Sequence, residues 1–189
     1  YVYGSRNVFT VSVDYRQKGH DEVLFLLDKG HTRITYVKEE PWRYASQLCI
    51  EGMKAAYRER RIPLRYFHTT PRHVKLWEDS AEAGYKLTQG MLRGDAAPTA
   101  LIFDAFAGAH AGLRAVRERG WDVPRDVSMI VNSEDHRVLR YDWPRLATSS
   151  VPSGKLVERA VEIILNPPKD CTTWLCAVLE PRESIGQAP

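Results

Sequence analysis

Short runs of apolar residues alternate along this chain with longer segments in which apolar positions recur every three or four residues. The short runs predict buried strands, at residues 8–13, 34–37, 64–67, 99–103, 127–131, 146–151 and 172–179. The longer segments predict amphipathic helices, at residues 16–29, 46–60, 78–92, 107–119 and 154–165. This regular alternation of strand and helix predicts parallel sheets with helices packed on their faces.

The residues between these segments suit the ends of helices. Ser46 is a candidate N-cap, and Gly30 and Gly120 follow predicted last turns, where a left-handed backbone favours glycine. Pro124 prevents the helix before Gly120 from resuming. Residues 98–131 therefore predict a strand, a helix and a second strand joined by short links. Such a βαβ unit has parallel strands.

Several short motifs stand in a fixed order. Residues 120–128 are Gly-Trp-Asp-Val-Pro-Arg-Asp-Val-Ser, and a Pro-Thr-Ala strand begins upstream at residues 98–100. Other pieces are Val-Asp-Tyr at 13–15, Gly-His-Thr-Arg-Ile at 30–34 and Pro-Arg-Leu-Ala-Thr at 144–148. This ordered set resembles the effector domain of the lactose-repressor family of bacterial transcription regulators. The resemblance spans nearly the whole chain.

The resemblance implies an α/β fold of the periplasmic-binding-protein-like type I, with two lobes of parallel sheet flanked by helices. Residues 1–31 and 147–166 would form a partial N-terminal lobe. Residues 32–146 and 170–185 would form a complete C-terminal lobe. The family's DNA-binding headpiece and first βα units have no counterpart here, so we expect the N-terminally incomplete sensor region of a regulator.

Composition narrows the class of protein. The chain has 189 residues, 43% of them hydrophobic, which allows a sizeable core. Its net charge of +3 is spread among acidic residues, so no basic stripe indicates nucleic-acid binding by this chain itself. The three cysteines lack metal-ligand spacing and predict free thiols in a reducing cytosol. No apolar run suits a secretion signal or a membrane span, so we expect a cytoplasmic protein without a membrane partner.

Motifs for catalysis are absent from the sequence. The six histidines are scattered, without the i, i+4 pairing of a helical zinc site, and no nucleophile elbow or glycine-rich phosphate loop occurs. We therefore expect no enzyme, no metal site and no cofactor. The main alternative to a regulator is a solute-binding protein of a transport system, which shares the fold. The missing secretion signal, the three cysteines and residues 120–128 favour the regulator.

Ligands of open α/β sheets bind beyond the carboxyl ends of parallel strands. The loops at these ends are rich in aromatic residues and carry a few polar ones. The candidate ligand-binding residues are Asp14, Tyr15, Trp42, Tyr44, Cys49, Trp77, Asp104, Ala105, Phe106, Asn132, Ser133 and Glu134.

The resemblance also shows departures at the ligand contacts. Cys49 stands where the family often has Arg, Ala105-Phe106 replace a usual Asn-Asp pair, and residues 131–134 replace Gly-Phe-Asp-Asp. With fewer partners for hydroxyl groups, two interpretations stay open. Either a less polar ligand is held mainly by Trp42, Trp77 and Phe106, which we favour, or the domain no longer binds a free sugar. The expected effector is thus a sugar-like or aromatic small molecule.

The resemblance further implies a homodimer. The paired surfaces would be the helix at 107–119 and the loop at 135–143, with an apolar centre formed by His110, Leu113, Leu139, Tyr141 and Trp143. For Leu113 and Trp143 the alternative is an ordinary place in the core. An effector would move the lobes and so control operator DNA, which would be contacted only through a headpiece missing from this chain.

Overall fold

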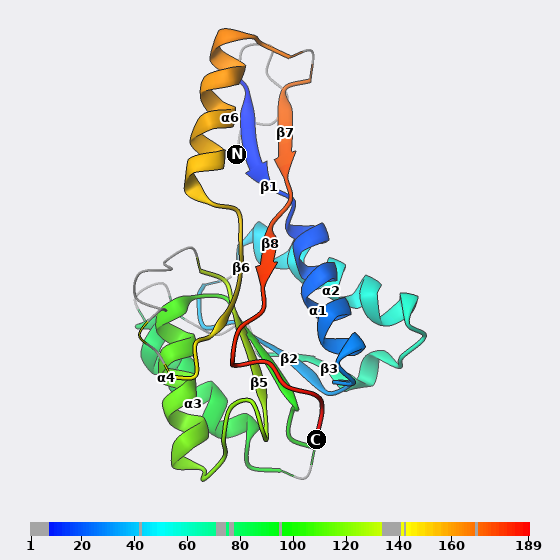
Figure 1. The fold of residues 1–189 in the computed structure, drawn as a ribbon, viewed down its shortest axis with the longest axis vertical. Helices are drawn as coiled ribbons and strands as arrows, with labels where there is room; N and C mark the ends of the chain where they lie inside the picture. Colours follow the sequence, from blue (N-terminus) through cyan, green and yellow to red (C-terminus); the bar gives the residue numbers. More distant parts are fainter. Residues whose placement is uncertain are drawn as a thin grey trace.

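The computed structural model describes residues 8–41, 43–70, 75, 78–94, 96–133, 141, 143–168 and 170–189. The N-terminal half of these residues forms β1 (Thr10–Val13), α1 (Tyr15–Asp28), β2 (Ile34–Val37), α2 (Tyr44–Glu59), the 3-10 helix η1 (Leu64–Tyr66), β3 (Phe67–Thr69) and α3 (Ser80–Met91). The C-terminal half forms β4 (Ala100–Phe103), α4 (Phe106–Glu118), β5 (Ser128–Val131), β6 (Ala147–Ser150), α6 (Ser153–Leu165), β7 (Thr172–Leu175) and β8 (Val178–Glu180). Figure 1 shows a larger body below and a smaller one above, which we call the upper unit.

The larger body is built on a six-stranded sheet in the order β3-β2-β4-β5-β6-β8. All neighbouring strands are parallel except β6 and β8, which are antiparallel. The three central strands are buried at every position, as expected for a sheet covered on both faces. The parallel α/β architecture predicted from the sequence is therefore confirmed.

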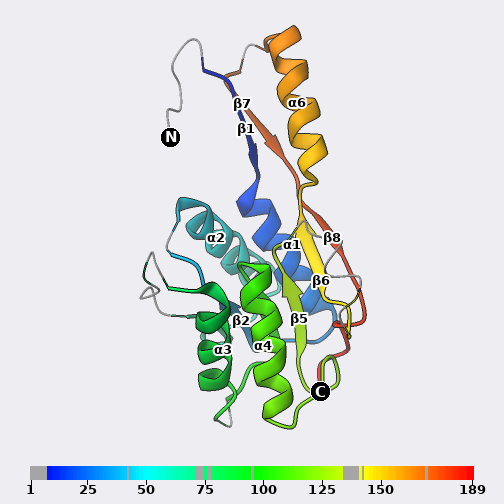
Figure 2. The same cartoon turned by 90° about the vertical axis from the view of Figure 1, so that its left-hand side faces the viewer.

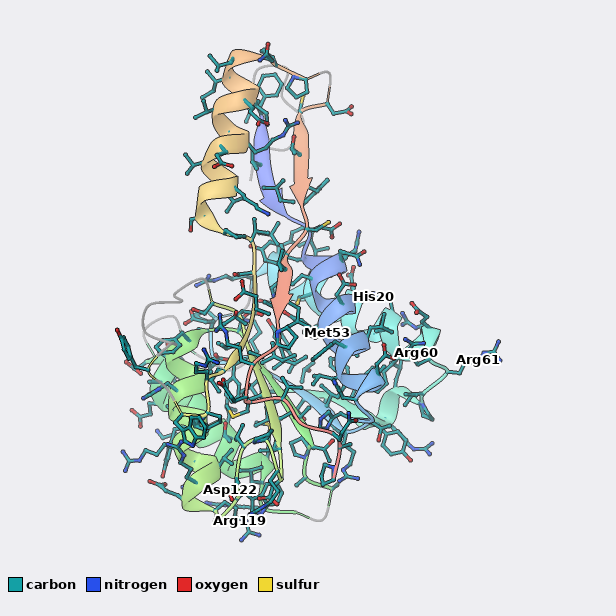
Figure 3. The ribbon with its side chains drawn as sticks, in the orientation of Figure 1. His20, Met53, Arg60, Arg61, Arg119 and Asp122 are labelled. Carbon is teal, nitrogen blue, oxygen red and sulfur yellow. The ribbon has the colours of Figure 1, made fainter. Side chains whose placement is uncertain are left out.

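Alternate residues of the central strands point into two separate cores. On one face, Ile102 packs with Met53 of α2 and with the buried side of α1. On the other face, Phe103 packs with Leu113 of α4. Figure 1 shows α3 and α4 together on one side of the sheet, with α1 and α2 on the other, and in Figure 2 the side with α3 and α4 faces the viewer. Figure 3 shows that Met53 points toward this interior, whereas Arg61, just beyond α2, points away from the body.

Glycines allow the helices of each pair to approach closely. A Cβ on Gly52 of α2 would collide with the carbonyl oxygen of Arg16 on α1, and one on Gly19 would collide with that of Cys49. On the opposite face, Gly84 of α3 faces the backbone of Gly108 in α4. Any larger residue at these positions would force the paired helices apart.

The upper unit consists of β1, β7 and α6. β1 and β7 form a parallel two-stranded sheet, and α6 lies beside β1. Apolar side chains of α6 are exposed, including Val157, Ile164 and Leu165. A sheet of only two strands is too small to cover all the apolar side chains of this helix.

The structure differs from the predicted lobe boundaries in three segments. α1 falls within residues 1–31 but packs against α2 of the larger body. β6 falls within residues 147–166 but lies between β5 and β8 of the large sheet. The predicted single strand at 172–179 is two strands, because the chain leaves the upper unit after β7 and joins the large sheet as β8.

Smaller differences concern helix starts and one strand. α2 begins two residues before Ser46, so Ser46 is not its N-cap. The predicted strand at 64–67 is η1 followed by β3. In the described part of the chain, no helix has the length and apolar character that a membrane crossing requires.

Candidate ligand-binding cleft

A hollow with a volume of about 370 Å³ opens where β1 and the parallel strands of the large sheet end. We call it the cleft. It lies at the carboxyl ends of the strands, the position at which open α/β sheets bind ligands. Its lining comes from segments far apart in the sequence: Val13, Tyr15, Lys18, Glu40, Arg43, Ala45, Ser46, Asp104, Ala105, Asn132, Ser133, Ser149, Ser150 and Val151.

Five of the predicted ligand-binding residues line the cleft together. Tyr15 lies in the first turn of α1, Asp104 and Ala105 follow β4, and Asn132 and Ser133 follow β5. They converge because parallel strands place the loops at their carboxyl ends on one edge of the sheet.

Four other predicted residues lie elsewhere. Asp14 caps α1 by accepting a hydrogen bond from the Gln17 amide at 3.0 Å. Tyr44 is exposed at the start of α2, and Phe106, the first residue of α4, packs against the core. Cys49 is buried in the contact between α1 and α2. The remaining candidates, Trp42, Trp77 and Glu134, lie outside the described residues.

The Asp104 carboxylate is held in place by Tyr36 and Lys38. The Tyr36 hydroxyl donates to its Oδ1 at 2.6 Å, and the buried Lys38 ammonium contacts its Oδ2 at 3.3 Å. Lys38 also donates to the carbonyl oxygens of Glu40 and Pro41 at 2.7 and 2.8 Å. Burial and the nearby Asp104 charge raise the pKa of Tyr36, so its hydroxyl keeps the proton that it donates. Asp104 is therefore a fixed acceptor at the base of the cleft.

A second buried carboxyl group lies behind Asp104. Glu39 accepts hydrogen bonds from the amides of Ala105 at 2.6 Å and Asp104 at 3.2 Å, at the start of α4. Gly108 leaves the space that this carboxyl group occupies. Burial, reinforced by the Asp104 charge, raises the pKa of Glu39 to about 8, although the Ala105 amide opposes the shift.

Lys18 of α1 is a cleft residue that the sequence analysis missed. Its ammonium group donates to Oε1 of Glu22 and to Oδ1 of Asn132. Burial, the largest effect, lowers the pKa of Lys18, but Glu22, Cys49 and Asp104 together outweigh it, and the pKa is raised above its ordinary value. A signal was present in the sequence, because residues 18 and 22 fall at helical spacing with Leu26 on the buried stripe of α1.

The lining is more polar than the sequence analysis expected. Besides Lys18, it gains Glu40, Arg43 and three serines: Ser46, Ser149 and Ser150. These groups can donate to and accept from several hydroxyl groups at once. Within the described residues, no group of three or more His, Cys, Asp or Glu side chains could hold a metal ion. The arrangement suits non-covalent binding of a small polar molecule.

A larger hollow of about 580 Å³ lies outside the cleft, between α1, α2 and Trp174 of β7. Among its lining residues, Arg16 pairs with Glu51 at 2.8 Å, and His20 pairs with Glu59, which lies outside the lining, at 2.8 Å. Figure 3 shows His20 on this helical side of the body. Because Arg16 and Glu51 are exposed and already paired, the smaller cleft at the carboxyl ends of the strands is the better candidate for a ligand site.

The predicted dimer residues divide into exposed and buried ones. Tyr141 and Trp143 are 84% and 75% exposed, and His110 is exposed on α4. Arg117 of α4 donates to the carbonyl oxygen of Trp143, which brings this loop beside the helix. Leu113 is only 3% exposed and packs in the core, so its predicted place at an interface is wrong, as is the alternative core position for Trp143. Leu139 lies outside the described residues.

The sheet order and the cleft at its carboxyl edge define a binding domain of the periplasmic type. The chain belongs to the family of periplasmic binding protein-like domains, whose model matches residues 23–185. The predicted resemblance to lactose-repressor regulators is confirmed by the relatives. The chain is 30% identical over 168 residues to the ribose operon repressor of Haemophilus influenzae, and 28% identical over 124 residues to catabolite control protein A of Priestia megaterium.

These matches cover 85% and 64% of this chain but only 48% and 35% of the two relatives. The chain therefore spans less than half the length of these curated relatives. Among solved structures, a LacI family regulator from Enterococcus faecium with bound ribose matches with a TM-score of 0.80 and 23% identity, covering 98% of this chain and 68% of that one. A LacI regulator from a Rhodococcus species matches with a TM-score of 0.82 and 20% identity, over 98% and 67%. These likenesses show the shared fold.

Proposed function

We propose that this chain is the ligand-sensing and dimerisation part of a bacterial transcription regulator. Its cleft binds a small hydroxylated molecule, and binding changes the affinity of the intact protein for operator DNA. The observation that carries this proposal is the composition of the cleft: Val13 comes from β1 of the upper unit, and Asp104 and Asn132 come from the larger body.

A ligand that contacts both bodies can distinguish between their relative positions. Because it binds one arrangement better than the other, it shifts the population toward that arrangement. The connections next to Tyr15 and Ser150 lead directly into β1 and α6 of the upper unit. Movement of this unit relative to the larger body would then alter the spacing of two DNA-binding headpieces in the intact dimer.

The chemistry of the lining favours a ligand of sugar type. Asp104 and Asn132 offer acceptors, and the serines offer hydroxyl groups that act as donor and acceptor. The volume of about 370 Å³ falls in the lower part of the range for small-molecule sites. This supports a sugar-like effector over the less polar one that the sequence favoured. Ribose and phosphate, which accompany two solved regulators of the same fold, are the first probes to use.

An aromatic effector stays the second candidate, because Trp42 directly precedes Arg43 and the first residues of α2, which line the cleft. It predicts that the tryptophan fluorescence of the intact protein responds to an aromatic ligand and that Trp42→Ala or Trp77→Ala weakens binding. A transport role has less support, since the relatives are regulators. A cytoplasmic location belongs to the same proposal.

Ligand binding is tested by a thermal-shift screen of the intact protein with sugars, sugar acids, nucleobases and phosphate. A hit is then titrated by calorimetry against the variant Asn132→Ala and the matched control Asn166→Ala, whose side chain is exposed at the end of α6. We expect Asn132→Ala to bind roughly tenfold more weakly, about 1.4 kcal/mol, and the control to bind like the wild type. A ligand that binds both variants equally well does not occupy the cleft.

A further inference from the structure

The Lys18–Glu22 ion pair is unusual for its depth. The Lys18 side chain is 5% exposed and that of Glu22 0%, one helical turn apart on α1. Charged groups at such depth are costly unless they are paired, and even a paired one is often replaceable by apolar residues. Other buried side chains of α1, such as Val23 and Leu26, are apolar. The packing of α1 in the described structure therefore does not explain why this pair is charged.

The pair retains unused hydrogen-bonding capacity beside the cleft. An ammonium group has three N–H donors, and among the described residues Lys18 has two acceptors, Glu22 and Asn132. Oε2 of Glu22 is buried without a hydrogen-bond partner in the described structure. Lys18 itself lines the cleft, so a ligand there lies within reach of the third donor.

The charges around the cleft balance in pairs. In the described part of the chain, Lys18 pairs with Glu22, Arg43 with Glu40 at 3.1 Å, and Lys38 with Asp104 at 3.3 Å. A ligand with its own negative charge would have to leave water for a site whose cations are already neutralised. An uncharged ligand loses no such solvation and can accept the remaining hydrogen bond from Lys18.

We propose that Lys18 is a specificity-determining residue that donates its third hydrogen bond to an oxygen of an uncharged, hydroxylated effector. Glu22 enforces the choice of an uncharged ligand by neutralising the ammonium group. This inference rests on the proposed function, because it assigns the ligand class of the same cleft. It predicts that removing the Glu22 charge converts the site into one that accepts an anion.

The test compares aldoses with the sugar acids of the same carbon skeleton. Calorimetry of the intact protein with D-ribose, D-ribonate, D-glucose and D-gluconate is run on the wild type, Lys18→Met and Glu22→Gln. The wild type is expected to bind an aldose at least tenfold more tightly than its acid. Glu22→Gln should lower this ratio at least tenfold, because the carboxylate of the acid can then replace that of Glu22 as the partner of the Lys18 ammonium group. Lys18→Met should lower the affinity for the aldose at least tenfold. The controls are Lys86→Met and Glu82→Gln, which alter an exposed pair of the same spacing on α3 and should leave both affinities unchanged.

The outcomes separate the two proposals. If the wild type binds an aldose and neither variant changes the affinity or the ratio, Lys18 has no part in specificity and only the proposed function stands. A wild type that prefers the acid also overturns the inference. If the wild type binds none of the four probes, the ligand class fails and the inference fails with it.

Should single variants not fold, Lys18→Met with Glu22→Leu removes both charges. That double variant, folded, must bind the aldose at least tenfold more weakly, and wild-type affinity in it would contradict the proposal.

Discussion

Glu39 is the residue whose ionisation should govern the pH dependence of stability. Its pKa is raised from 4.5 to about 8 in the folded protein, chiefly by burial. Between these values the folded protein holds a proton that the unfolded chain has released. Stability therefore falls as pH rises through this window, by about 1.4 kcal/mol per pH unit from this group, and levels off above pH 8.

The variant Glu39→Gln isolates this effect. We expect the free energy of unfolding of the wild type, measured in urea at pH 5.5, 7 and 8.5, to decrease by roughly 2–4 kcal/mol more than that of the variant. Glu82→Gln, on the exposed side of α3, should keep the wild-type slope. Equal slopes in the wild type and Glu39→Gln would show that Glu39 is ionised in the folded protein at neutral pH.

Gly108 makes the burial of Glu39 possible. A Cβ at this position would overlap the Glu39 carboxyl group, so Gly108→Ala should cost roughly 1–3 kcal/mol in the free energy of unfolding. The matched control is Gly90→Ala, in α3, where an added Cβ meets open space. There alanine should stabilise the helix by up to about 1 kcal/mol. Similar effects of the two changes would contradict the close packing described for Gly108.

At the scale of elements, the C-terminal segment after β8 ties two strands of the large sheet together. The buried Ser184 hydroxyl donates to the carbonyl oxygen of Met129 at 2.6 Å and accepts from the amide of Ala147 at 2.8 Å. It thus bridges β5 and β6 beyond the two residue pairs through which they contact directly. The cleft depends on this junction, because Asn132 just after β5 and Ser150 at the end of β6 both line it.

Removing this hydroxyl should weaken the junction. We expect Ser184→Ala to lower the free energy of unfolding by roughly 1–3 kcal/mol, since it leaves two buried backbone groups without partners. The amide of Ala147 should also exchange its hydrogen faster, whereas Ser80→Ala at the start of α3 should change the stability by less than about 0.5 kcal/mol. Unchanged protection of Ala147 in Ser184→Ala would refute the bridge.

The sequence predicted most elements because their patterns are local. Residues 34–37 form a strand with the predicted bounds, and the helices before Gly30 and Gly120 each end two residues before these glycines. The prediction of one strand at residues 172–179 is wrong because this single apolar run contributes to two sheets, and nothing in the local sequence marks where the chain passes from one sheet to the other. The strand predicted at 64–67 begins only at Phe67. Residues 64–66 form η1 instead, and the pairing with β2 that defines the strand starts after it.

The candidate site was predicted in part for the same reason. Strand ends are local features, so Asp104 and Asn132 could be placed at one edge of the sheet. Lys18 and Arg43 lie on or near helices that pack beside this edge, and their position depends on how α1 and α2 meet the sheet. Cys49 was misplaced because its neighbour Gly19 draws α1 so close that the thiol is covered.

At the scale of the whole molecule, the exposed aromatic residues beside α4 are the proposed dimer surface. Trp143→Asp should shift the intact protein toward monomer, because a charge in an apolar contact is costly. Light scattering after size-exclusion chromatography measures this, with Leu64→Ser on η1 as a control at an exposed apolar position elsewhere. A Trp143→Asp protein that keeps the mass of the wild type would remove this surface from the interface.

The exposed apolar side of α6 belongs to the same scale. Val157, Ile164 and Leu165 face outward from the upper unit, which has one helix over two strands. Movement of this unit relative to the larger body is the step that links the cleft to DNA in our proposal. The connections that must transmit it run through Tyr15 and Ser150, both at the cleft.

The measurement that tests this account most directly is the affinity of the intact protein for its operator, with and without a ligand shown to bind the cleft. Fluorescence anisotropy with a labelled operator selected from random DNA gives this affinity. We expect a saturating ligand to change the operator affinity of the wild type at least tenfold, and that of Asn132→Ala only at correspondingly higher ligand concentration. An operator affinity that stays the same when the cleft is fully occupied would contradict the account.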